Sequence, residues 1–275
     1  MPNIIAECGC SHQGSIDIAK RMISVASNYC KVDAVKFQKR TVESMPESQL
    51  NRPYLGAHSF GKTYGEHRTA LEFSINQHKE LQKWCIVNNV EYACSVWDVE
   101  AARQISFLNP AYIKIPSAAN LDFKMIKWLL NNYSGKLHIS MGMTTLNEKM
   151  KIQRLISMSP QKFVVYHCIS AYPVSFDDIF LKDIEMYKGW GAGIGYSGHH
   201  RGIAVDMAAI ARGVEYVERH FTLDRTWKGT DHAASVEPDG LRRLTRDALA
   251  VDRAMKESNG GLKEVEIPAR KKLRR

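Results

Sequence analysis

The 275-residue sequence predicts an α/β fold, the (β/α)8 TIM barrel, and three observations support this prediction. Short apolar runs alternate with segments of helical periodicity along the chain. Eight such runs are each followed by a helical segment, which is more strands than a doubly wound open sheet usually has. The pattern occupies about 255 residues, close to the roughly 250 residues typical of this barrel. We therefore favour the barrel over the open sheet.

The predicted strands are short apolar or alternating runs that are bounded by turn-forming residues. They occupy residues 4–7, 34–38, 92–95, 112–115, 137–140, 163–167, 192–196 and 216–217. The predicted helices have apolar residues three and four positions apart, with Ser74 or Asn76 as the cap of one helix and Pro238 in the first turn of another. They occupy residues 16–29, 76–88, 99–107, 123–131, 146–158, 179–188, 203–212 and about 238–256.

One predicted connection is much longer than the others. Residues 39–73 separate the second strand from its helix, and they are rich in aromatic, basic and glycine residues. Connections of this length inside a compact domain are usually functional lids or binding loops. We therefore predict one catalytic barrel over residues 1–256 with a long loop at 39–73, followed by a basic C-terminal tail at 257–275.

The formal net charge of +9 raises the possibility of a nucleic-acid partner. Residues 261–275 contain six basic and two acidic residues, a net charge of +4. Nearly half of the excess therefore lies in a terminal segment of the kind that is usually solvated. We expect no nucleic-acid partner, and the alternative is duplex binding by the tail. The mildly basic remainder suits an enzyme that acts on anionic substrates.

The sequence also bounds the location of the protein. No apolar run approaches the roughly 20 residues that a membrane span needs. The N-terminus enters a strand pattern without a basic and apolar signal segment, so we expect no membrane association and a cytoplasmic location.

There is no Cys-x-x-Cys pair, and we interpret the cysteines as reduced and structural. They are Cys8, Cys10, Cys30, Cys85, Cys94 and Cys168.

The carboxyl ends of the strands of such a barrel converge on one mouth, where active sites form. In this sequence the strand ends carry lysines, serines, histidines and carboxylates, which together suit an anion, a metal ion and a proton shuttle. These residues are Glu7, Lys36, Gln38, Ser95, Lys114, Ser117, Ser140, His167, Ser170, Tyr172, Ser197, His199, His220 and Asp231.

Each of these residue types also has an ordinary structural role. Serines at loop starts often form turns, and a histidine at a strand end is often only hydrogen-bonded. Lys36 and Lys114 are embedded in apolar runs, where a buried ammonium group needs an anionic partner. Glu7 follows Ile-Ile-Ala and would be costly in a core without a function. His199 and His220 follow neighbouring parallel strands, so they could share a metal ion.

A series of motifs in the same order resembles the sialic acid synthase (N-acetylneuraminate synthase) family. The similarity extends from residue 4 to about residue 256, and the loop at 52–67 and the Trp227-Lys-Gly segment look closer to the animal branch, which uses a phosphorylated sugar. The motifs are Ile5-Ala-Glu7, His12-Gln-Gly14, Lys36-Phe-Gln38, Tyr64-Gly-Glu-His67, Lys114-Ile-Pro-Ser117, Ser140-Met-Gly-Met143, His167-Cys-Ile-Ser-Ala-Tyr-Pro173, Gly195-Tyr-Ser-Gly-His199, Glu218-Arg-His-Phe-Thr222 and Thr226-Trp-Lys-Gly-Thr-Asp-His232.

The resemblance implies a barrel that condenses phosphoenolpyruvate with N-acetylmannosamine, its 6-phosphate or a related 2-acetamido sugar, giving a nine-carbon 2-keto sugar acid and phosphate. It implies that His199 and His220 hold Mn²⁺ or Mg²⁺, which polarises the sugar aldehyde. It also implies a set of residues around each substrate. Those of phosphoenolpyruvate are Lys36, Ser95, Lys114, Ser117, Ser140, Ser170 and Ser197, and those of the sugar are Glu7, Gln38, Tyr172 and Asp231.

The sequence departs from the family pattern at three places. Ala119 stands where the family commonly has an acid, and Ser170 stands where it often has Asn. The sequence does not contain the small antifreeze-like C-terminal domain that family members usually carry, so we expect a homodimer or higher homo-oligomer held by barrel surfaces and a more open sugar site. These departures leave an alternative, a sugar-phosphate or anion-binding barrel without catalytic activity.

Overall fold

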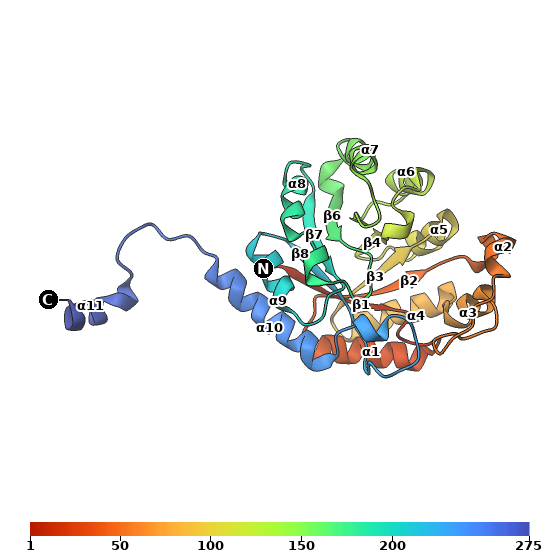
Figure 1. The fold of residues 1–275 in the computed structure, drawn as a ribbon, viewed down its shortest axis with the longest axis horizontal. Coiled ribbons are helices and arrows are strands. Elements are labelled where there is room, and N and C mark those ends of the chain that lie inside the picture. The colour runs from red at the N-terminus through yellow and green to blue at the C-terminus, as the bar shows by residue number, and fades with distance from the viewer. Residues whose placement is uncertain (275) are drawn as a thin grey trace.

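The computed structural model describes residues 1–274, and within them eight parallel strands close into one barrel (Figure 1). Each strand pairs with the next along the chain, and the first pairs with the last, as in Glu7 opposite His220. The predicted (β/α)8 barrel is therefore confirmed. The strands are β1 (Asn3–Gly9), β2 (Ala34–Lys39), β3 (Glu91–Val96), β4 (Tyr112–Ile115), β5 (Lys136–Ser140), β6 (Phe163–Cys168), β7 (Gly193–Gly198) and β8 (Tyr216–His220).

Helices follow the strands and form the outer layer. Their starts are set by local capping, because the Ser74 side chain accepts a hydrogen bond from the Gln77 amide and Asp98 accepts one from the Ala101 amide. The helices of the outer layer are α1 (Ile16–Asn28), α4 (Ile75–Val87), α5 (Val99–Phe107), α6 (Phe123–Asn132), α7 (Leu146–Ile156), α8 (Ile184–Lys188), α9 (Ala204–Ala211) and α10 (Pro238–Ala254).

Several predicted boundaries were wrong, and β1 runs further than predicted, to Gly9. The helix predicted at 179–188 is shorter, because Phe180 has a left-handed backbone (φ 49°) and a 3-10 turn at Leu181–Asp183 precedes α8. Strands β7 and β8 run further than predicted, to Gly198 and His220. The apolar pattern stops early in both strands because Ser197, Glu218 and His220 are polar residues that line the mouth.

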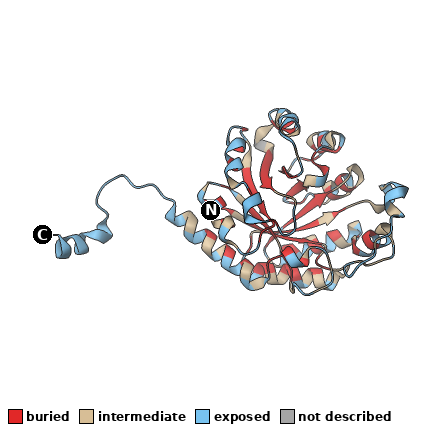
Figure 2. Ribbon diagram, viewed as in Figure 1, coloured by how far each residue is buried: buried red, intermediate tan, exposed pale blue. Residues whose placement is uncertain are grey.

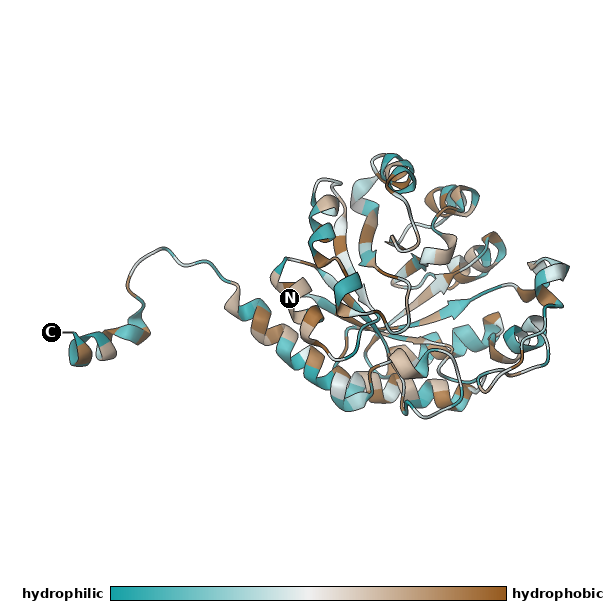
Figure 3. Ribbon diagram, viewed as in Figure 1, coloured by the Kyte–Doolittle hydropathy of each residue, from teal (hydrophilic) through white to brown (hydrophobic). Residues whose placement is uncertain are grey.

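Buried residues lie on the strands and on parts of the surrounding helices (Figure 2), and they form two hydrophobic clusters. The larger lies between the strands and the helices, whose surfaces alternate between hydrophobic and hydrophilic residues (Figure 3). The smaller fills the lower interior of the barrel with Ile5, Ala34, Ala93, Tyr112, Val164 and Tyr166. The rings of Tyr112 and His138 stack there at 3.7 Å between centroids. The interior below the mouth is thus a packed floor and no channel.

The long loop contains short helices that the sequence did not predict. They are η1 (Val42–Ser44), α2 (Glu47–Leu50) and α3 (Tyr64–Leu71). The end of the loop is fixed to the barrel because the Phe73 ring stacks on the His12 ring at 4.0 Å. The backbone of Ala70 also lies against Gly14, where an added Cβ would be 2.1 Å from the Ala70 carbonyl oxygen. The loop is therefore held over one side of the mouth.

The tail leaves the barrel beyond α10 and extends away from it (Figure 1). Residues 253–274 are exposed, including a 3-10 turn (Glu264–Glu266) and a short helix, α11 (Ile267–Leu273). The sequence predicted a basic tail here but no helix. In the part of the chain that the structure describes, none of the helices has the length and apolar character that crossing a bilayer requires.

Candidate active site

The carboxyl ends of the strands surround a cavity of about 340 Å³, and every site residue named from the sequence except His167 lines it. These residues are separated by up to 224 positions but share one mouth, as the barrel prediction requires. Their chemical roles stay predictions. The residues are Glu7, Lys36, Gln38, Ser95, Lys114, Ser117, Ser140, Ser170, Tyr172, Ser197, His199, His220 and Asp231.

Two buried lysines and two buried carboxylates occupy the floor of the mouth. Lys36 forms an ion pair with Glu7 and donates a hydrogen bond of 2.6 Å to Ser95 Oγ. Lys114 Nζ lies 2.6 Å from Glu218 Oε1, and Lys36 Nζ lies 3.7 Å from the same oxygen. Each of these four side chains is at most 5% exposed. Formal charges on the floor therefore balance before any ligand binds.

The two carboxyl groups of the floor have different pKa values because their surroundings differ. Burial raises the pKa of Glu7 to about 7, and the Glu218 carboxylate adds to the rise while Lys36 opposes it. Burial alone would raise the pKa of Glu218 as well, but the ammonium groups of Lys114 and Lys36 lower it to about 2. Glu218 is thus a permanent anion, whereas Glu7 can gain or lose a proton near neutral pH.

Hydroxyl groups line the wall of the mouth beside the lysines. An added Cβ at Gly142 would lie 2.5 Å from Ser170 Oγ and 2.7 Å from Ser117 Oγ, so glycine leaves this space open. The amide of Asn120 fixes the turn by donating hydrogen bonds to the carbonyl oxygens of Ser140 (2.9 Å) and Gly142 (3.0 Å). Ser170 Oγ has no hydrogen-bond partner within residues 1–274. The wall can therefore offer free hydroxyl donors to an anion.

The two histidines line the mouth at the ends of the neighbouring strands β7 and β8. His199 Nδ1 lies 2.7 Å from the carbonyl oxygen of Ile169, which leaves its Nε2 free for a ligand. His220 Nδ1 lies 3.7 Å from Asp231 Oδ2, and burial lowers the pKa of His220 to about 4. The Tyr172 ring packs against the His199 ring at 4.1 Å. A backbone carbonyl beside one imidazole and a carboxylate near the other are typical of the surroundings of metal-binding histidines.

The histidine pair could hold a divalent cation, although the protein ligands alone would be few. No group of three or more histidine, cysteine or acidic side chains suited to a metal ion occurs among the residues described. A cation at this place would complete its coordination with water or substrate, as at an open catalytic site.

The rim of the mouth next to the long loop carries two arginines that the sequence did not indicate. Arg68 donates a 2.6 Å hydrogen bond to Glu72 Oε1, and the Arg40 guanidinium lies 3.5 Å from the centre of the Trp97 ring. Both arginines are largely buried, and they share the single carboxylate of Glu72, with Arg40 Nη1 3.7 Å from it. Arg40 Nη1 and Arg68 Nε have no hydrogen-bond partner within the described residues. This rim thus carries two guanidinium groups with unused hydrogen-bond donors.

Three other residues of the site had different signals in the sequence. Glu218 has one, because it lies two residues before His220 on the same strand and so faces the same side. Arg40 has the same signal, because it lies two residues after Gln38, next to the end of β2. Arg68 has none, because no periodic pattern locates a side chain inside a long irregular loop.

One strand-end residue lies outside the mouth. His167 faces the helix layer, where its Nε2 lies 2.7 Å from the carbonyl oxygen of Ile179. All six cysteines are free, and two of them, Cys10 and Cys168, line the mouth.

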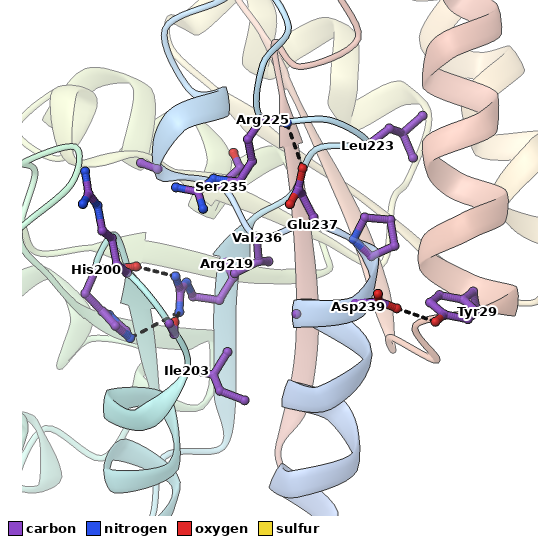
Figure 4. Close-up of a pocket in the computed structure, with 15 residues that line it drawn as sticks. Tyr29, His200, Ile203, Arg219, Leu223, Arg225, Ser235, Val236, Glu237 and Asp239 are labelled. Atoms are coloured by element: carbon purple, nitrogen blue, oxygen red, sulfur yellow. Dashed lines mark hydrogen bonds between the residues drawn. The ribbon is translucent and has the colours of Figure 1, made fainter.

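A second cavity, of about 590 Å³, lies outside the barrel between β8, the loop after β7 and the start of α10 (Figure 4). Arg219 is buried there and donates hydrogen bonds to Asp206 (2.5 Å) and to the His200 carbonyl oxygen (2.6 Å). Glu237 accepts a hydrogen bond from the Arg225 amide, and Asp239 accepts one from the Tyr29 hydroxyl. Arg219 thus pairs with a carboxylate, whereas the two acidic side chains that line this cavity are bound by a backbone amide and a hydroxyl group.

Comparison with known proteins gives one consistent family. The NeuB family model matches residues 22–260. Human N-acetylneuraminate-9-phosphate synthase is 38% identical over 273 residues, which are 98% of this chain and 76% of the human protein. N,N'-diacetyllegionaminic acid synthase of Campylobacter jejuni is 30% identical over 258 residues, 92% of this chain and 77% of that protein. The crystal structure of N-acetylneuraminic acid synthetase from Leptospira borgpetersenii, in complex with citrate, matches with a TM-score of 0.84 and 26% sequence identity. The match covers 100% of this chain and 93% of the Leptospira chain.

Proposed function

The chain belongs to the NeuB family, and on that premise we propose that it is a synthase that condenses phosphoenolpyruvate with N-acetylmannosamine, its 6-phosphate or a related 2-acetamido sugar. The products are a nine-carbon 2-keto sugar acid of the sialic acid type and phosphate. The related human and Campylobacter proteins are synthases of such acids by name. We further propose that it acts in the cytoplasm as a homo-oligomer.

The observation that carries this proposal is the placement of an anion site beside an imidazole pair in one cavity. Lys36 and Lys114, with the serine hydroxyls, face the space in which a carboxylate and a phosphate would lie. His199, His220 and Asp231 face the same space from the neighbouring strands. Phosphoenolpyruvate needs the first set of groups, and a sugar aldehyde needs the second.

The chemistry follows from these groups. The methylene carbon of phosphoenolpyruvate attacks the sugar aldehyde, water adds to the cationic C2, and the C2–O bond to phosphate breaks. Mn²⁺ or Mg²⁺ held by His199 and His220 would supply Lewis acidity for the aldehyde oxygen. Lys36 and Lys114 stabilise the negative charge of phosphate and carboxylate. Glu7, whose pKa of about 7 allows both protonation states, would carry the proton that passes from the added water.

Within this proposal we favour the phosphorylated sugar. Arg40 and Arg68 share one carboxylate at the rim, and a buried guanidinium without a full complement of partners is costly unless an anion binds. Both side chains line the cavity with Asp231, on the sugar side of the mouth. A phosphate on C6 of the sugar would supply the missing negative charge.

Release of inorganic phosphate from phosphoenolpyruvate tests the proposal. Release should depend on added sugar and stop when either substrate is left out. Lack of phosphate release with N-acetylmannosamine, its 6-phosphate and related 2-acetamido sugars would contradict it.

One observation favours a second candidate, a non-catalytic anion-binding barrel. Ala119 is buried and lies in the turn after Ser117. Members of the sialic acid synthase family commonly have an acidic residue at this position. Calorimetry separates the candidates, because a non-catalytic barrel would bind phosphoenolpyruvate and leave it intact in the presence of every sugar.

A further inference from the structure

The carboxylate of Glu218 connects the two lysines on the floor of the mouth. Its Oε1 lies 2.6 Å from Lys114 Nζ and 3.7 Å from Lys36 Nζ, and it accepts a 3.3 Å hydrogen bond from Ser197 Oγ. All three partners belong to the predicted phosphoenolpyruvate set. Neither the strand-end pattern nor the family resemblance assigned a role to Glu218 itself.

The two lysines depend on Glu218 to different degrees. Lys36 also pairs with Glu7 and Ser95. Within residues 1–274, Glu218 is the only carboxylate within 4.0 Å of Lys114 Nζ. This ammonium group also lies over the face of the Tyr166 ring, 4.3 Å from its centroid. Loss of Glu218 would therefore leave the buried Lys114 side chain without its carboxylate partner and without a fixed direction.

Glu218 is part of the cavity wall as well as of the barrel. It lines the mouth two residues before His220 on the same face of β8. Its second oxygen, Oε2, has no hydrogen-bond partner among the described residues. An ion pair that only stabilised the barrel would be enclosed by packed side chains, whereas this one borders the space that a substrate would fill.

We infer that Glu218 is a positioning residue: it holds Lys114, and more weakly Lys36, in the orientation that receives the phosphoenolpyruvate anion. This inference rests on the proposed function of the mouth. Glu218 itself repels the anion and does not touch the reacting carbons. Its contribution is the fixed direction of two ammonium groups before the substrate arrives.

The direction in which Glu218→Gln changes the affinity for phosphoenolpyruvate distinguishes a positioning role from a role in charge balance alone. If Glu218 acted only as a negative charge, then Glu218→Gln would make the mouth more positive and would strengthen binding of phosphoenolpyruvate. If it positions Lys114, the same substitution weakens binding, because the ammonium group loses its direction. The carboxamide has nearly the same shape, so the comparison changes little else.

The experiment is isothermal titration calorimetry with phosphoenolpyruvate alone, which needs no turnover. We expect Glu218→Gln to weaken binding roughly 10- to 100-fold, and Glu218→Asp, which keeps the charge, to recover part of the loss. Glu215→Gln is the matched control, because Glu215 lies just before β8 and binds the Ile194 amide outside the mouth. It should bind as the wild type does. Circular dichroism establishes that each variant is folded.

A double-mutant cycle tests whether Glu218 acts through Lys114. In a Lys114→Met background, Glu218→Gln should change phosphoenolpyruvate affinity by no more than about twofold. In turnover, Glu218→Gln should raise the KM for phosphoenolpyruvate and leave the KM for the sugar unchanged. Tighter or unchanged binding in Glu218→Gln, or losses that multiply in the double mutant, would overturn the inference. Wild-type protein that binds phosphoenolpyruvate but consumes no sugar would refute the proposed function and leave this inference in place.

Discussion

The imidazole rings of His199 and His220 lie with their centroids 5.3 Å apart, although 21 positions of sequence separate them. One follows β7 and the other ends β8, so the parallel pairing of these two strands brings them together. His199 is oriented by the Ile169 carbonyl oxygen, and His220 is near the carboxylate of Asp231. This pair is the part of the mouth best suited to a divalent cation.

We therefore expect His199→Ala and His220→Ala each to lower phosphate release at least about 100-fold, because the cation would lose one of its two protein ligands. The barrel should stay folded, since both side chains lie at the mouth and outside the main core. Chelation should remove activity, and added Mn²⁺ or Mg²⁺ should restore it. Full activity after exhaustive chelation would contradict the role of the pair.

Arg40→Ala should change sugar selection. A charge-assisted hydrogen bond contributes about 1.5–3 kcal/mol, so kcat/KM for the sugar 6-phosphate should fall roughly 10- to 100-fold. The value for the unphosphorylated sugar should change little. Arg52→Ala is the control, since Arg52 lies in the same loop and packs against the Tyr64 ring. Equal losses with both sugars would show that Arg40 does not bind the sugar phosphate.

Glu7 should make stability depend on pH. Its pKa rises from 4.5 to about 7 in the folded protein, so the stabilisation by its protonated form is complete below about pH 4.5. It is lost as pH rises through about 7, because the unfolded chain ionises first. The measurement is the difference in unfolding free energy between the wild type and Glu7→Gln, obtained by urea denaturation. This difference should fall by up to about 3 kcal/mol between pH 4.5 and 8. A difference that stays constant or grows would refute this.

Gly14→Ala should loosen the long loop. Gly14 has φ +77°, and its added Cβ would lie 2.1 Å from the Ala70 carbonyl oxygen at the end of α3. We expect a loss of at least about 1–3 kcal/mol in urea unfolding and a higher KM for the sugar. Gly189→Ala is the control, because no atom lies within 4 Å of its added Cβ. Its stability should change by less than about 0.5 kcal/mol. Wild-type stability in Gly14→Ala would show that this contact does not fix the loop.

The barrel could be predicted from the sequence because its strands are buried on both faces and read as apolar runs. The strand Tyr112–Ile115 was predicted with both boundaries correct. The predicted site residues also share one cavity, since parallel strands end at the same rim. The last residues of β7 and β8 were not predicted as strand. The mouth-facing side chains there are polar, so they do not continue the apolar pattern from which the strands were predicted.

Two parts of the site depend on contacts that local patterns do not contain. Arg40 and Arg68 meet at Glu72 through the path of a long loop, which periodicity cannot predict. Glu218 is an ordinary charged residue in the sequence, and only the closed barrel brings it to Lys114 across 104 positions. Phe180 adopts a left-handed backbone that side-chain type alone does not indicate.

The most direct test of the proposed condensation is ¹³C NMR of a reaction with phosphoenolpyruvate labelled at C3, N-acetylmannosamine 6-phosphate and Mn²⁺ or Mg²⁺, followed by removal of the metal before the spectrum. The account predicts that the label becomes a methylene carbon bonded to the former aldehyde carbon of the sugar, with one phosphate released for each bond formed. Label that stays in phosphoenolpyruvate, or that appears in the methyl group of pyruvate, would contradict it.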